Sequence, residues 1–143
     1  MTQILIAEDN AMNRELLREL LEPSGYSVVE ACNGQEALTM IGQSRPDLLL
    51  LDISMPVLDG YATVRKIREN PNLSKLPVIA ITAYAMRGDR EKILNSGFNG
   101  YLSKPVNARS LAEELDRHLS KQCAKPDQGY GREAKAAAEP GSD

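Results

Sequence analysis

The chain has 143 residues, of which 42% are hydrophobic and 26% are charged, and its formal net charge is −3. This composition is typical of a globular domain with its own core, and the charge gives no reason to expect a nucleic acid partner. The two cysteines are not spaced as in a metal site or a disulfide framework, which predicts a reducing, cytoplasmic compartment. No run of about 18 apolar residues occurs, so we predict no membrane insertion.

The first part of the chain predicts a strand, a helix and a second strand. Residues 4–7 are apolar and predict a buried strand. Apolar residues then recur at the spacing of one helix face, and they are Met12, Leu16, Leu17, Leu20 and Leu21. Asn10 is placed to cap this helix, and Pro23 with Gly25 is placed to end it. Residues 27–31 predict the second strand, followed by Cys32, which we interpret as a small packing residue.

The middle of the chain predicts a helix and a strand that is buried on both faces. Asn33 and Gly34 are typical of a turn, and residues 35–44 then predict the second helix. A break at residues 45–47 precedes four leucines, residues 48–51, which predict the third strand. A strand without polar residues is typical of a parallel sheet covered by helices on both sides.

The second half repeats the same alternation. Asp59 is interpreted as the cap of a third helix, which Pro71 ends. Residues 77–82 predict the fourth strand, residues 87–96 a fourth helix, and residues 100–102 a short fifth strand. A last helix follows Asn107, which can cap it, because leucines recur at intervals of four residues, at Leu111, Leu115 and Leu119.

The order of elements predicts the fold class and the domain organisation. Five strands alternating with five helices predict an α/β fold with a doubly wound five-stranded parallel sheet. We expect this domain to span residues 1–120. Residues 121–143 are rich in glycine, proline and balanced charges, which predicts a disordered C-terminal tail. This tail is too short and too polar for a DNA-binding domain, so we expect output through a protein partner, unless the sequence is an excised piece of a longer chain.

Polar side chains follow four of the predicted strands, at ends that meet on one edge of a parallel sheet. Glu8 and Asp9 follow the first strand, and Asp52 follows the third. Thr82 ends the fourth strand, and Lys104 follows the fifth. Clustered carboxylates raise each other's pKa unless a cation intervenes, and one lysine does not balance three acids. Mg²⁺ prefers oxygen ligands and retains water, so it fits this set.

Such a site is suited to phosphate chemistry. A carboxylate-held Mg²⁺ with open positions attracts phosphate, and Lys104 and Thr82 supply a positive charge and a hydroxyl donor. Asp52 is then the nucleophile, because an aspartate can form an acyl phosphate. Each carboxylate taken alone is better explained as a helix cap, but their convergence favours a site. The only histidine, His118, is predicted at the surface or a helix end, which argues against Ser-His-Asp chemistry.

The chain resembles response-regulator receiver domains of the CheY type over about residues 3–119. The motifs that carry the resemblance are IAEDN, LLLLDISMPVLDG, IAITA and YLSKP, in this order. The stretch TAYAMRGDREKIL also resembles receivers of hybrid kinases and of stand-alone single-domain regulators. The resemblance implies a flavodoxin-like fold and a role in two-component signalling.

The resemblance also implies roles for residues. The implied Mg²⁺ ligands are Glu8, Asp9, Asp52 and the backbone carbonyl of Ser54. Asp52 would accept a phosphoryl group from a phosphohistidine of a histidine kinase or histidine phosphotransfer protein. Lys104 would pair with the phosphoryl oxygens. In receivers of this type the lysine is usually followed by a proline in a cis peptide bond, here Lys104-Pro105.

The same resemblance implies a conformational switch. The Thr82 hydroxyl would move to the new phosphate and Tyr101 would change rotamer behind it, altering a face built by the fourth helix, fifth strand and fifth helix for a downstream protein. Tyr84, two residues after Thr82, either shields the phosphoryl group from water or contacts a partner.

We predict a phosphoacceptor switch that catalyses only its own phosphorylation and dephosphorylation. The alternative is an enzyme, a phosphatase or phosphotransferase of the haloacid dehalogenase class, which also uses an aspartyl nucleophile. That class normally needs a second carboxylate two residues after the nucleophile. Ser54 occupies this position, which argues against the alternative.

Overall fold

In the computed structural model, which describes residues 2–83 and 87–123, five parallel strands form one sheet in the order β2-β1-β3-β4-β5. The strands are β1 (Gln3–Ala7), β2 (Ser27–Ala31), β3 (Leu48–Asp52), β4 (Val78–Thr82) and β5 (Gly100–Ser103). The helices are α1 (Ala11–Leu21), α2 (Gly34–Gln43), α3 (Gly60–Glu69), α4 (Arg87–Asn95) and α5 (Ala108–Cys123), with 3₁₀ turns at Glu22–Ser24 and Pro71–Leu73. The predicted doubly wound α/β fold is confirmed.

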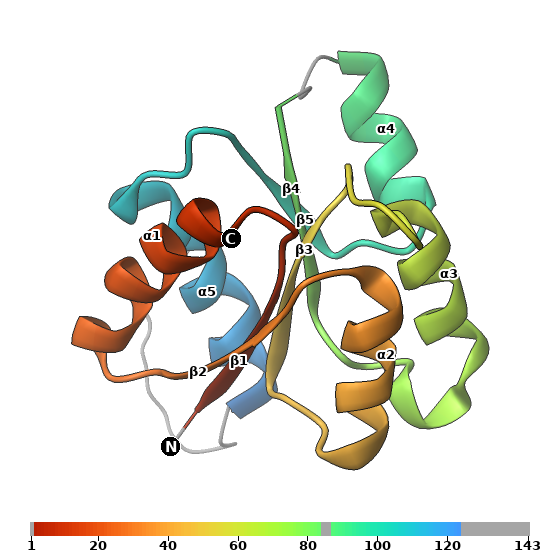
Figure 1. Ribbon diagram of the computed structural model, residues 1–143, viewed down its shortest axis with the longest axis horizontal. Helices are drawn as coiled ribbons and strands as arrows, with labels where there is room; N and C mark the ends of the chain where they lie inside the picture. Colours follow the sequence, from red (N-terminus) through yellow and green to blue (C-terminus); the bar gives the residue numbers. More distant parts are fainter. Residues whose placement is uncertain (1, 84–86, 124–143) are drawn as a thin grey trace.

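Helices cover both faces of the sheet, α1 and α5 on one side and α2, α3 and α4 on the other (Figure 1). The leucines of β3 alternate between the two resulting cores. Leu48 and Leu50 pack with residues of α1 and α5, whereas Leu49 and Leu51 pack with residues of α2, α3 and α4. All five residues of β3, Asp52 included, are buried. The unbroken leucine run is therefore explained by a central strand with no solvent-facing side.

Side-chain caps define the beginnings of four helices. As predicted, the side chains of Asn10, Asp59 and Asn107 accept hydrogen bonds from backbone N–H groups in the first turns of α1, α3 and α5. The turn predicted at Asn33 and Gly34 is found as a bend at Cys32 and Asn33, where Asn33 also caps α2 by accepting from the Glu36 N–H at 2.8 Å and Gly34 is the first residue of the helix. An asparagine that caps a helix and one that forms a turn look alike in sequence.

The predicted apolar face of α1 is only partly buried. Leu17 and Leu21 are buried, but the side chains of Met12 and Leu16 are 78% and 45% exposed. The helix is turned so that two of its arginines lie against Glu30 of β2. The ion pairs lie beside the core, and the apolar side chains of Met12 and Leu16 stay at the surface.

Two further residues differ from their predicted positions. Cys32 is exposed rather than packed, because β2 ends at the residue before it. His118 is partly buried within α5, since its side chain is 12% exposed and its Nε2 lies 3.2 Å from Oε1 of Glu114. Both side chains approach Gly100 of β5, where a Cβ would lie 2.5 Å from that oxygen.

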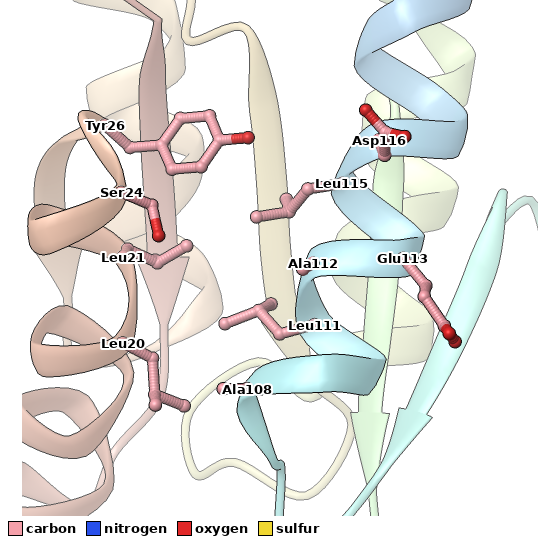
Figure 2. Close-up of a pocket in the computed structure, with 10 residues that line it drawn as sticks. All are labelled: Leu20, Leu21, Ser24, Tyr26, Ala108, Leu111, Ala112, Glu113, Leu115 and Asp116. Carbon is pink, nitrogen blue, oxygen red and sulfur yellow. The ribbon is translucent and has the colours of Figure 1, made fainter.

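A groove of about 350 Å³ lies between α1 and α5 (Figure 2). Leucines from both helices form its floor, and the ring of Tyr26 extends across its upper end towards α5. Burial and then the charge of Asp116 raise the pKa of Tyr26 above its usual value. None of the polar residues predicted to form the site lines this groove.

Helix α5 extends to Cys123, three residues beyond the expected end of the domain. The tail predicted from residue 121 falls mainly on residues 124–143, which lie outside the described residues. Tyr84, to which a role was also assigned, lies outside them as well. The domain boundary therefore stays a prediction. Within the described ranges, no helix has the length and apolar character needed to cross a membrane.

Candidate functional site

Three carboxylates meet at the carboxyl ends of β1 and β3. Glu8, Asp9 and Asp52 each place an oxygen within 4.8 Å of the other two. Glu8 and Asp52 are buried, with 1% and 2% exposure, whereas Asp9 is exposed. Because β1 and β3 are neighbouring parallel strands, residues 44 positions apart in the chain come together at one edge.

Lys104, from the segment after β5, reaches into this cluster. Its Nζ lies 3.0 Å from Oδ2 of Asp52 and 3.4 Å from Oε1 of Glu8. Its backbone N–H donates to the Thr82 carbonyl at 2.8 Å, and the peptide bond to Pro105 is cis, as the resemblance implied. Burial lowers the pKa of the ammonium group, but the hydrogen bond and charge of Asp52, with Glu8, outweigh it, so the Lys104 pKa is raised.

The environment of Glu8 favours its protonated form when no metal is bound. Burial, followed by contact with Asp52, raises the pKa of Glu8 from 4.5 to about 7, although the Asn10 N–H and Lys104 oppose the shift. Among the described residues, no hydrogen-bond donor satisfies Oε1 of Glu8, and the 3.4 Å contact with Lys104 is an ion pair only. A buried carboxylate oxygen without a donor, next to two more carboxylates, fits a hard divalent cation such as Mg²⁺.

Glu8→Gln is expected to remove a pH-dependent loss of stability from the metal-free protein. Between pH 4.5 and about pH 7 the folded state holds a proton on Glu8 that the unfolded state has released. The free energy of unfolding therefore falls as pH rises through this window, by on the order of 3 kcal/mol in total. Urea unfolding in EDTA at pH 5 and pH 8 should show the variant gaining stability over the wild type only at pH 8. An equal difference at both pH values would contradict this.

Asp52 is held at the tip of β3 by its surroundings. Its Oδ1 accepts the Ser54 N–H at 3.1 Å, and its Oδ2 faces Lys104. The loop after it turns back so that the Gly60 N–H donates to the Ile53 carbonyl at 2.9 Å. One carboxylate oxygen is thus paired with the ammonium group and the other with the backbone, which fixes the direction in which Asp52 points.

Thr82 and Tyr101 lie on the two strands beyond β3. Thr82 is the last residue of β4, directly after Ile81, which pairs with Asp52 in the register, and it is 5% exposed. Tyr101 of β5 is half-buried, and the guanidinium of Arg90 from α4 lies 5.7 Å from its ring centroid. Thr82 therefore lies one residue beyond the strand partner of Asp52, and Tyr101 lies next to α4.

Two residues that support the site were missed in the sequence. Arg14 of α1 donates from Nη1 to the backbone carbonyl of Glu8 at 2.7 Å. Gly60 packs against the backbone of Asp52 and Ile53. The sequence marks Asp59 as a helix cap but not the close approach of Gly60 to the Asp52 backbone, and no local pattern marks an arginine that contacts a distant carbonyl.

The comparisons with known proteins agree with this geometry. The family described as response regulator receiver domain matches residues 4–116. The polar-differentiation response regulator DivK of Brucella anthropi is 40% identical over 116 residues, which cover 81% of this chain and 94% of that protein.

Two solved structures that contain receiver domains are also similar to this chain. The receiver domain of the Pseudomonas aeruginosa sensor histidine kinase PA1611, with a magnesium ion in its active site cleft, has a TM-score of 0.77 and 39% identity, covering 83% of this chain and 98% of that one. A chain from the co-crystal of the Saccharomyces cerevisiae phosphotransfer protein Ypd1 with the Ssk1 receiver domain has a TM-score of 0.79 and 30% identity, covering 85% and 90%.

Proposed function

Because the chain belongs to the response regulator receiver domains of two-component systems, we propose that Asp52 is the residue at which it accepts a phosphoryl group. The observation that carries this assignment is the position of the Asp52 carboxylate. It lies at the tip of the central strand, with one oxygen 3.0 Å from the ammonium group of Lys104, beside two further acids. Asp59, the other acid in the same motif, instead caps α3.

The remaining residues have separate roles in this proposal. Glu8, Asp9, Asp52 and the Ser54 carbonyl hold Mg²⁺, which when bound neutralises the carboxylates and attracts phosphoryl oxygens. An oxygen of Asp52 bonds to phosphorus as the phosphorus–nitrogen bond of the donor phosphohistidine breaks. The Lys104 ammonium group stabilises the charge on the transferred group.

Partners follow from the same chemistry. We propose a histidine kinase or histidine phosphotransfer protein as the donor, and the co-crystal of a related receiver with a phosphotransfer protein supports this. After transfer, Thr82 and Tyr101 would change position and alter the face formed by α4, β5 and α5 for a downstream protein. A cytoplasmic location stays a prediction.

Incubation with acetyl phosphate and Mg²⁺ should add one phosphoryl group to the protein, and intact-mass spectrometry measures this. EDTA should abolish the gain, because the carboxylates would then repel the phosphate. Stoichiometric labelling that decays slowly supports the switch. Repeated turnover of a generic phosphate ester such as p-nitrophenyl phosphate would instead favour the enzyme alternative, and labelling that persists in EDTA would contradict the metal assignment.

A further inference from the structure

A line of charged contacts joins α1 and β2 to the segment that carries Glu8 and Asp9. The guanidinium of Arg14 makes two contacts at once, since Nη1 donates to the Glu8 carbonyl at 2.7 Å and Nε donates to Oε1 of Glu30 at 3.1 Å. The other oxygen of Glu30 accepts from Nε of Arg18 at 2.6 Å. Arg14 is only 15% exposed, so water competes little for these bonds. We call these three side chains the α1–β2 ion cluster.

The backbone of Glu8 is held at several points. Its N–H donates to the Ala31 carbonyl of β2 at 3.1 Å, and its carbonyl accepts from Arg14. Its side-chain Oε2 accepts the Asn10 N–H at 3.1 Å. These bonds fix the peptide unit between Glu8 and Asp9, which sets the direction in which the next side chain leaves the chain.

Asp9 has no such support of its own. Within residues 2–83 and 87–123, its carboxylate makes no hydrogen bond and no ion pair. Its position therefore depends on the backbone on which it stands. Of the bonds that hold this backbone, the one from Arg14 comes from a side chain anchored elsewhere.

We infer that Arg14, anchored by Glu30, is a positioning residue for the divalent cation, because it orients the peptide that carries Glu8 and Asp9. The inference rests on the proposed function. Arginine suits the role because its planar guanidinium presents donors in two directions, and hydrogen bonds from a charged donor are the strong ones. Groups that orient metal ligands without touching the metal typically change its affinity by about 10-fold to 100-fold when removed.

Arg18 provides a matched control. It lies on the same helix and binds the same carboxylate, but its other partner is Glu22 and not the segment with the acids. Arg14→Met and Arg18→Met each remove one guanidinium group from the ion cluster. Only the first removes a bond to the Glu8 carbonyl.

Isothermal titration of the unphosphorylated full chain with Mg²⁺ tests the inference. Arg14→Met should raise the Mg²⁺ dissociation constant by about 10-fold or more. The dissociation constant of Arg18→Met should stay close to the wild-type value. Urea unfolding in EDTA measures the structural effect of each change separately. Equal Mg²⁺ affinities for Arg14→Met and the wild type would overturn the inference, as would equal losses in both variants.

Glu30→Gln keeps the inference testable if Arg14→Met does not fold. Glu30→Gln should weaken Mg²⁺ binding in the wild-type background, because Arg14 loses its charged anchor. In an Arg14→Lys background it should cause little further loss of Mg²⁺ affinity, because lysine lacks the planar guanidinium that makes both bonds at once. If the losses of Mg²⁺ affinity caused by Glu30→Gln and Arg14→Lys were fully additive, Glu30 would not act through Arg14, and the inference would be contradicted. Failure of the wild type itself to bind Mg²⁺ would overturn the proposed metal site. If the wild type and the Arg14 variant bind Mg²⁺ equally well, only the inference about Arg14 is overturned.

Discussion

Asp52→Asn is expected to abolish phosphoryl acceptance from acetyl phosphate, with no mass gain in the time that saturates the wild type. An amide is a poor nucleophile and cannot replace the carboxylate that attacks phosphorus. The change is nearly isosteric, and the side chain keeps an oxygen that can accept the Ser54 N–H. The loss of labelling should therefore occur in a folded protein, and intact mass together with circular dichroism checks both parts.

Asp59→Asn is the control for this result. Asp59 belongs to the same motif, but its side chain accepts the Ala62 N–H at 2.9 Å at the start of α3. Asparagine caps helices about as well as aspartate, so labelling should stay at the wild-type level. Labelling retained by Asp52→Asn, or lost in Asp59→Asn, would mean that the acceptor has been assigned to the wrong aspartate.

Gly60→Ala is expected to lower the free energy of unfolding by about 2–3 kcal/mol and to slow labelling as well. A Cβ at this position would lie 2.6 Å from Cα of Ile53 and 2.7 Å from the carbonyl oxygen of Asp52. Both are backbone atoms, so no side-chain rotation relieves the clash. The loop after Asp52 would have to move, weakening the bond from the Gly60 N–H to Ile53. Urea unfolding measures the stability.

Gly42→Ala is the matched control. Gly42 lies within α2, and a Cβ there would meet no atom within 4 Å. Alanine favours the helix over glycine, so this change should be neutral or stabilise the protein by up to about 1 kcal/mol. A Gly60→Ala variant as stable as Gly42→Ala would show that the loop relaxes around the added methyl group without cost.

Local patterns were enough to predict the order of the elements. Strand and helix spacing, and the caps at Asn10, Asp59 and Asn107, depend on residues close in the chain. The leucine run predicted β3 with both faces covered, and parallel strands place their carboxyl ends on one edge. The convergence of Glu8, Asp9, Asp52 and Lys104 therefore follows from the order of the elements and the topology that this order predicts.

The tertiary structure decided what depends on distance and orientation between elements. The rotation of α1 exposes Met12 and places Arg14 against the Glu8 carbonyl, because helix periodicity defines an apolar stripe but not the ion pairs at its edges. The contact of Gly60 with the Asp52 backbone and the burial that raises the pKa of Glu8 arise only when segments far apart in the chain pack together. By itself, the sequence determined which chemical groups reach this edge of the sheet. Packing decided how each is held and charged, because burial and interatomic distance are properties of the folded chain.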